Sequence, residues 1–186
     1  MMKKKLCFVA LLFVTTLGMA AAYTSLRKYN NTQEAITSAI EYNPAFEFSS
    51  SAQMDAMVKA YLKVKDALVT ENHSQASDAG SALITALKQL EKTSDKDKFG
   101  KAGKAALKSA FSLSKATSIK EQRSAFKDLS ESIYQLLKDN GNTTTLYFDY
   151  CPMAKASWLS DKKAIENPYY GQSMLSCGII KDTLNP

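Results

Sequence analysis

Histidine is almost absent from this chain of 186 residues, which contains only His73. Serine and cysteine nucleophiles are most often activated by a histidine base, and zinc sites draw on histidine and cysteine ligands. The motifs Gly-x-Ser-x-Gly, His-Glu-x-x-His and Cys-x-x-Cys and a glycine-rich phosphate loop are also missing from the sequence. We therefore expect a protein that is not an enzyme, and we interpret His73 as a surface residue.

A long apolar run is lacking as well. The apolar run at residues 6–19 follows three lysines and is shorter than the roughly 20 residues that cross a bilayer. Residues 20–22 are alanines, the small side chains that a signal peptidase recognises. We predict a cleaved signal peptide at residues 1–22, export to the periplasm, and no integral membrane segment after cleavage.

A large excess of one sign of charge is missing from the mature chain. The whole sequence has 24 basic and 18 acidic side chains, and loss of the three signal-peptide lysines leaves 21 against 18. Basic and acidic residues alternate along the chain, so we expect no nucleic-acid partner.

Hydrophobic residues spaced three and four apart are what the mature chain does contain, and this spacing is typical of amphipathic helices. After a polar lead-in at residues 23–49, we predict a single helical domain over residues 50–186. The predicted helices lie at 51–71, 73–92, 97–116 and 119–139. Asn72 and the capping box from Ser118 to Glu121 mark the starts of the second and fourth helices. Short connections favour antiparallel neighbours, so we predict a mainly α fold, an up-and-down four-helix bundle.

The tail at residues 143–186 differs in composition from the helices. Residues 143–150 combine threonines with aromatic side chains, which favours a strand, and residues 178–180 supply a short return strand. An isolated hairpin of this size is only marginally stable, so we expect it to pack on the bundle.

Two cysteine–methionine pairs give the tail its candidate chemistry, Cys151 with Met153 and Met174 with Cys177. Residues two apart on a strand and residues three apart on a helical turn point to the same side, so each pair can converge. Thiolate and thioether sulfur select Cu(I) and Ag(I). The alternative is a Cys151–Cys177 disulfide, the usual state of two cysteines in an oxidising compartment, in a non-enzymatic structural or protein-interaction module. The residues alone leave both interpretations open.

A set of motifs adds a family resemblance to these interpretations. The motifs are Ala60-Tyr61-Leu62, Gln122-Arg123-Ser124-Ala125-Phe126, Tyr147-Phe148-Asp149-Tyr150-Cys151-Pro152-Met153, Asn167-Pro168-Tyr169-Tyr170-Gly171, Met174 and Cys177-Gly178. Together they resemble a bacterial exported domain of unknown function, which also occurs attached to periplasmic adaptor subunits of heavy-metal efflux pumps of the copper and silver type. The resemblance implies Cu(I) or Ag(I) binding at Cys151, Met153, Met174 and Cys177, and heavy-metal efflux components as partners.

Arg123 lies beside the inward face of the fourth predicted helix. We expect its guanidinium group to pair with a carboxylate such as Asp66 or to donate to carbonyl groups of the tail. Trp158, Tyr169 and Tyr170 are expected to pack the tail against the bundle rather than to line a ligand groove.

Overall fold

The structure of this protein is a computed structural model that describes residues 50–186. The predicted signal peptide and lead-in, at residues 1–49, lie outside the described residues. In the described part, no helix is both long enough and apolar enough to cross a membrane.

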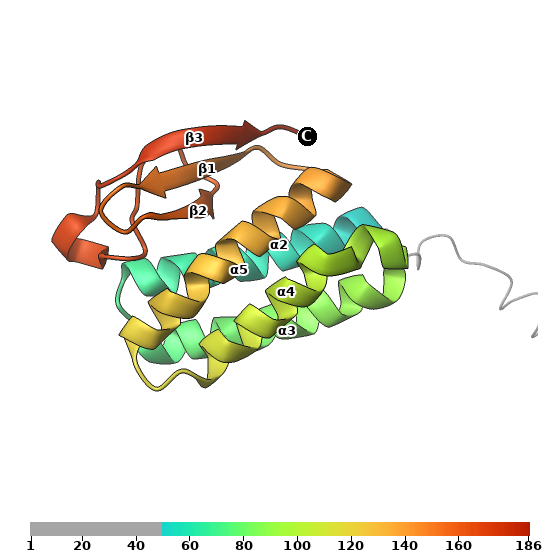
Figure 1. Cartoon of the computed structure of the whole chain (residues 1–186), viewed down its shortest axis with the longest axis horizontal. Helices are drawn as coiled ribbons and strands as arrows, with labels where there is room; N and C mark the ends of the chain where they lie inside the picture. The colour runs from blue at the N-terminus through green and yellow to red at the C-terminus, as the bar shows by residue number, and fades with distance from the viewer. Residues whose placement is uncertain (1–49) are drawn as a thin grey trace, which may run out of the picture. The chain divides into compact units, whose positions relative to one another are not determined.

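Four helices form the first part of the fold. They are α2 (Ser50–Val69), α3 (His73–Thr93), α4 (Lys96–Lys115) and α5 (Ile119–Asn140). Loops of two or three residues join them, and consecutive helices run antiparallel (Figure 1). The predicted four-helix bundle is confirmed, and each helix begins and ends within two residues of its expected range.

Both of the expected N-caps form. The Asn72 side chain accepts a hydrogen bond from the N–H of Gln75 at 3.0 Å, and the Ser118 hydroxyl accepts one from the N–H of Glu121 at 3.3 Å. The Glu121 carboxylate in turn accepts the N–H of Thr117 at 2.8 Å, one residue before the usual capping-box position. These bonds occupy backbone donors that have no partner inside a helix.

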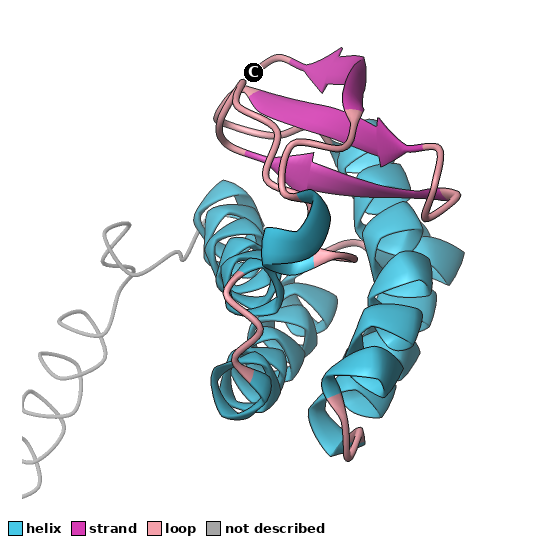
Figure 2. Cartoon of the chain, turned by 90° about the vertical axis from the view of Figure 1, so that its left-hand side faces the viewer, coloured by secondary structure: helices cyan, strands magenta, loops and turns pink. Residues whose placement is uncertain are grey.

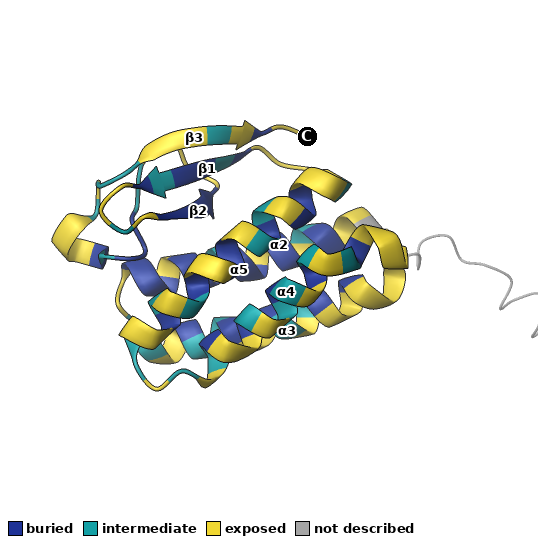
Figure 3. Cartoon of the chain, viewed as in Figure 1, coloured by how far each residue is buried: buried dark blue, intermediate teal, exposed yellow. Residues whose placement is uncertain are grey.

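The tail forms a three-stranded antiparallel sheet. Its strands are β1 (Leu146–Cys151), β2 (Ala156–Ser160) and β3 (Ile179–Leu184), in the order β2-β1-β3. The predicted pairing of the first and last strands is confirmed, with Tyr150 opposite Ile179. The sequence does not predict β2, because all five of its residues are buried and the alternation of a half-exposed strand is missing. Figure 3 shows this difference between buried β2 and largely exposed β3.

The sheet covers an open side of the bundle. α2 packs on α3, α3 on α4 and α4 on α5, whereas α2 and α5 have little contact with each other. β2 lies against both α5 and α2, so the sheet closes the side that these two helices leave open (Figures 1 and 2). The tail is therefore part of the hydrophobic core rather than an appendage.

Aromatic rings carry the contact between tail and bundle, as expected. Trp158 of β2 is fully buried and meets Tyr169 edge to face, with ring centroids 5.9 Å apart. Tyr169 packs in turn on Phe126 of α5 at 5.9 Å. On the other part of the sheet, Phe148 stacks on Tyr134 of α5 with centroids 3.8 Å apart.

A buried hydroxyl ties β2 to α2 and gives a direct test of this arrangement. The Tyr61 hydroxyl accepts the N–H of Leu159 at 3.0 Å and lies 2.7 Å from the Ser130 hydroxyl. Tyr61→Phe leaves both groups without this partner, so we expect the free energy of unfolding in urea to fall by about 2 kcal/mol. Tyr170→Phe is the matched control, because that hydroxyl makes an exposed bond to the Met153 carbonyl. Equal losses in the two variants would contradict a buried anchor at Tyr61.

Candidate functional site

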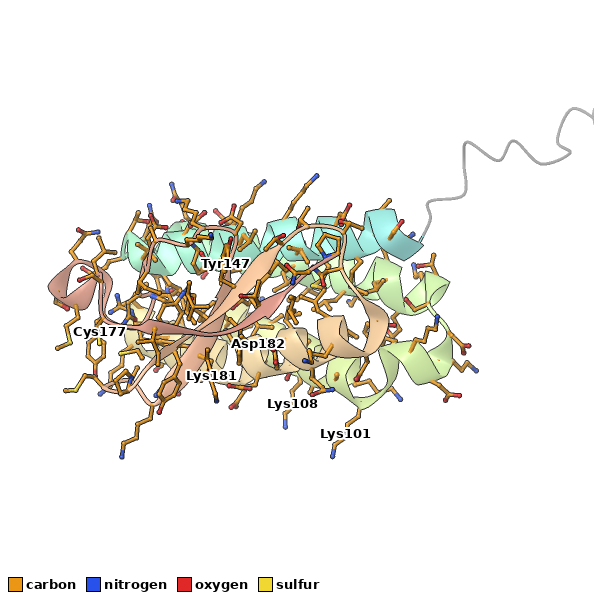
Figure 4. The ribbon with its side chains drawn as sticks, turned by 90° about the horizontal axis from the view of Figure 1, so that it is seen from above. Lys101, Lys108, Tyr147, Cys177, Lys181 and Asp182 are labelled. Atoms are coloured by element: carbon orange, nitrogen blue, oxygen red, sulfur yellow. The ribbon has the colours of Figure 1, made fainter. Side chains whose placement is uncertain are left out.

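The fold brings Cys151 and Cys177 into contact. Cys151 is the last residue of β1, and Cys177 follows the short helix η2 (Gly171–Met174). Their Sγ atoms lie 2.9 Å apart as free thiols. Cys151 is buried, whereas Cys177 is partly exposed and lies near η2 (Figure 4).

The surroundings of the two thiols make them unequal acids. Burial raises the pKa of the Cys151 thiol, but hydrogen bonds to its sulfur from Cys177, the Ala154 N–H and Asn167 outweigh burial, so the pKa is lowered. The Ala154 N–H lies 3.4 Å from this sulfur. The hydrogen bond to Cys151 raises the pKa of the Cys177 thiol. Of the two thiols, Cys151 therefore ionises at the lower pH, with Cys177 as its hydrogen-bond donor.

Asn167 is the residue that fixes the position of Cys177. Its side-chain N–H donates to the Cys177 carbonyl at 2.8 Å, and its side-chain oxygen accepts the N–H of Tyr169 at 2.8 Å. Asn167 is fully buried. Sequence reasoning used this residue only as part of a motif, although an Asn-Pro dipeptide is a turn signal and an asparagine side chain commonly bonds to the backbone two residues on.

The methionines lie beside the thiols in two different ways. β1 ends at Cys151, so Met153 lies in the turn between β1 and β2 with 61% of its surface exposed. The expectation that Cys151 and Met153 share one side of an extended strand is therefore wrong. Met174 and Cys177 do share a turn, because the Cys177 N–H donates to the Met174 carbonyl at 3.1 Å. Met174 is 38% exposed, and the four-sulfur ligand set stays a prediction.

Harder ligands do not gather anywhere in the described chain. Among residues 50–186, no group of three or more His, Cys, Asp or Glu side chains is placed to hold a metal ion. A metal at the two thiols would be coordinated by thiolate sulfur, alone or together with thioether or backbone atoms. Such a ligand set suits Cu(I) or Ag(I) and does not suit zinc or calcium.

A buried carboxylate next to the thiols was not expected from the sequence. Asp149 lies two residues before Cys151 on β1, so both side chains face the same side of the sheet. It pairs with Trp158 across the strands, and neither its carboxylate oxygens nor the indole N–H has a hydrogen-bond partner in the described structure. Burial raises the pKa of the Asp149 carboxyl to about 7, although Lys65 partly offsets this effect.

Lys65 of α2 is a second buried charged residue that the sequence pattern did not predict. Its ammonium group is fully buried and lies 2.7 Å from Asp66 and 3.2 Å from Glu166. Glu166 belongs to the loop before Asn167, so this cation joins α2 to the segment that positions Cys177. Burial of a lysine with carboxylate partners is the usual way for a protein to keep such a charge inside.

Arg123 and His73, which the sequence analysis also considered, both make contacts that join parts of the fold. Arg123 donates to the Pro168 carbonyl at 2.8 Å, as expected, but its ion pair is with Glu71 at 2.9 Å. The carboxylate is therefore Glu71 rather than Asp66, the example given above, because Asp66 pairs with Lys65. His73 is not freely exposed, since its Nε2 lies 3.0 Å from the Ala116 carbonyl and joins α3 to the end of α4.

The fold and the site together define a mainly α domain, a four-helix bundle whose C-terminal sheet carries a dithiol at one end. Residues 57–145 match the model of a family described as "Protein of unknown function (DUF3347)". The match covers the helices from Met57 onward and ends before β1, so the four sulfur residues lie beyond it. No curated protein and no solved structure is similar enough to this chain to count as a match.

Proposed function

We propose that this chain is a non-catalytic, exported protein that binds Cu(I) or Ag(I) in the periplasm as a buffer or as a donor to efflux components. Cys151 and Cys177 supply thiolate ligands, and Met153 and Met174 supply thioether ligands. The observation that carries the proposal is the contact of the two thiols, 2.9 Å apart, at the end of the sheet with one pKa lowered. The resemblance of the tail motifs to a domain attached to efflux adaptors also supports Cu(I) or Ag(I) binding.

The proposed site is open to exchange. Cys177 and both methionines reach the surface, whereas Cys151 is buried. Linear or trigonal sulfur coordination needs few ligands, and soft ligands select a monovalent soft cation over zinc. Surface thioethers next to a buried thiolate allow a metal to arrive and leave by stepwise ligand exchange.

Methionine variants test the proposed ligand set. Met153→Leu and Met174→Leu preserve volume and remove the thioether, so we expect each to weaken Cu(I) binding by roughly tenfold without loss of fold. Affinity is measured by competition with a colorimetric Cu(I) chelator. Met57→Leu is the control, because Met57 is fully buried in the bundle. Unchanged Cu(I) affinity in both tail variants would remove the methionines from the site.

A structural disulfide is the second candidate, and the same sulfur contact favours it. Cys151 and Cys177 are 26 residues apart, so a bond between them would add roughly 3.5 kcal/mol in the chain-entropy model. Native mass spectrometry of the mature protein, purified without reductant and exposed to Cu(I), separates the two functions. A mass lower by two hydrogens and no metal uptake supports the disulfide module. A full-mass protein that takes up Cu(I) and rejects Zn(II) supports the metal site.

A further inference from the structure

A groove beside the proposed metal site is lined by cations. It has a volume of about 500 Å³ between α5 and the β1–β2 turn. Its lining residues are Lys120, Arg123, Ser124, Lys127, Met153, Ala154, Tyr169 and Tyr170. Three of these side chains are cationic and none is acidic, and Met153, one of the proposed metal ligands, is also part of the lining.

The cations of the groove are held in place but are not fully neutralised. Lys127 donates to the Ala154 carbonyl at 2.9 Å and lies over the Tyr169 ring, and it forms no ion pair within residues 50–186. Arg123 is fixed by the Pro168 carbonyl and shares its charge with Glu71. Lys120 is exposed and has no ion pair within residues 50–186. The groove therefore keeps a net positive charge next to a potential metal ligand.

We propose that this groove docks an acidic segment of the protein that exchanges Cu(I) or Ag(I) with the sulfur site. The inference rests on the proposed metal function and names the chemistry of the partner. A metal passes between proteins by ligand exchange, which requires the partner's ligand to come next to Met153. An extended segment lying in the groove meets that condition, and complementary charge speeds and orients the encounter.

The neighbouring surface favours a narrow partner over a broad anionic one. The next groove, between α4 and α5, contains the carboxylates of Glu121 and Asp128, which are exposed. A bilayer surface or a nucleic-acid duplex would bring negative charge against these groups as well as against the lysines. A single acidic segment avoids them, because it can follow the one groove whose charged lining is entirely positive.

Peptide binding to the metal-free, full-length mature protein tests the proposal. The probe is a short fluorescent peptide with glutamate at alternate positions and one methionine, and its reference has glutamine in place of each glutamate. We expect the glutamate peptide to bind at low ionic strength and to shift the amide resonances of Lys120, Lys127 and Met153. Lys120→Glu should weaken this binding by about fivefold or more, because it reverses an unpaired charge.

Lys115→Glu is the matched control. Lys115 is also an exposed lysine, but it lines the neighbouring groove, so this variant should change peptide affinity by less than about twofold. No binding of the glutamate peptide, equal binding of the glutamine peptide, or equal losses in the two lysine variants would overturn the docking proposal. Lysine-dependent binding to phosphatidylglycerol vesicles without peptide binding would overturn it too.

Cu(I) affinity of Lys120→Glu is measured separately. We expect it to equal that of the unsubstituted protein, because Lys120 is outside the sulfur set. Failure of the metal site would appear as loss of Cu(I) uptake with peptide binding intact. Failure of the groove would appear as intact Cu(I) uptake without charge-dependent peptide binding.

Discussion

Asp149→Asn is expected to stabilise the reduced, metal-free protein at about pH 8 and to leave its stability nearly unchanged at about pH 4. The cause is the buried carboxyl of Asp149, whose pKa is raised from 3.8 to about 7. Between these values the folded protein keeps a proton that the unfolded chain releases. The contribution of Asp149 to the free energy of unfolding is therefore highest below pH 3.8. It falls as the pH rises from 3.8 to about 7, and it stays low above about pH 7.

The size of the effect follows from the shift and from the replacement. A rise in the pKa of Asp149 from 3.8 to about 7 means that folding disfavours the ionised carboxylate by roughly 4 kcal/mol. The amide that Asp149→Asn introduces would itself lack good partners beside Trp158, so we expect a net gain of about 2 kcal/mol at high pH. Urea unfolding monitored by the single tryptophan, which lies opposite Asp149 in the sheet, gives the measurement at each pH.

Asp182→Asn is the control with the opposite sign. The hydrogen bond from the Tyr134 hydroxyl lowers the pKa of the Asp182 carboxyl, so its contribution is present at high pH and lost as the pH falls. This variant should therefore be destabilised near neutral pH and approach the parent in acid. If the difference between Asp149→Asn and the parent were the same at all pH values, Asp149 would not titrate in the folded protein.

The helices could be predicted because their information is local. The stripe from Met57 through Tyr61, Val64 and Leu68 repeats at helical spacing, and all four side chains are buried. Ser118 is likewise a local signal, since a cap acts on the residues that follow it. Short loops then leave antiparallel packing as the compact solution.

The tail was harder to predict because its contacts are distant in sequence. β2 is buried on every side by α2, α5 and the rest of the tail, so its five residues carry no alternating pattern. Met153 was assigned to an extended strand, yet the chain turns directly after Cys151. Pro152 is the residue that could have signalled this, because proline cannot donate to a central ladder.

The charged interior of the site was not predictable from spacing. Lys65 lies beside the apolar stripe of α2, and its partner Glu166 is 101 residues away. Asp149 occupies a strand position between aromatic residues, where a polar side chain usually faces water. Neither burial follows from the sequence pattern, because both depend on contacts between segments that are distant in the sequence.

Cys151→Ser is expected to reduce Cu(I) affinity more than Cys177→Ser does. Hydrogen bonds hold the pKa of Cys151 below its usual value, so this thiol loses its proton more readily than that of Cys177, whose pKa is raised. A serine hydroxyl is a hard ligand that stays protonated, and the loss should exceed the roughly 100-fold cost of removing an outer-shell partner. Cys177→Ser leaves the buried thiolate and the surface thioethers in place, so measurable binding should persist.

The comparison of these two serine variants also separates the metal site from the disulfide. Both substitutions prevent the disulfide, so a structural staple predicts that each variant loses the difference in stability between oxidising and reducing conditions. A thiolate site predicts unequal Cu(I) affinities, with competition for Cu(I) weakest in Cys151→Ser. A thiolate site also predicts that the Cu(I) affinity of the unsubstituted protein falls as the pH is lowered, because protons compete with the metal for sulfur. Equal, unweakened Cu(I) binding in both variants would place the metal away from the dithiol altogether.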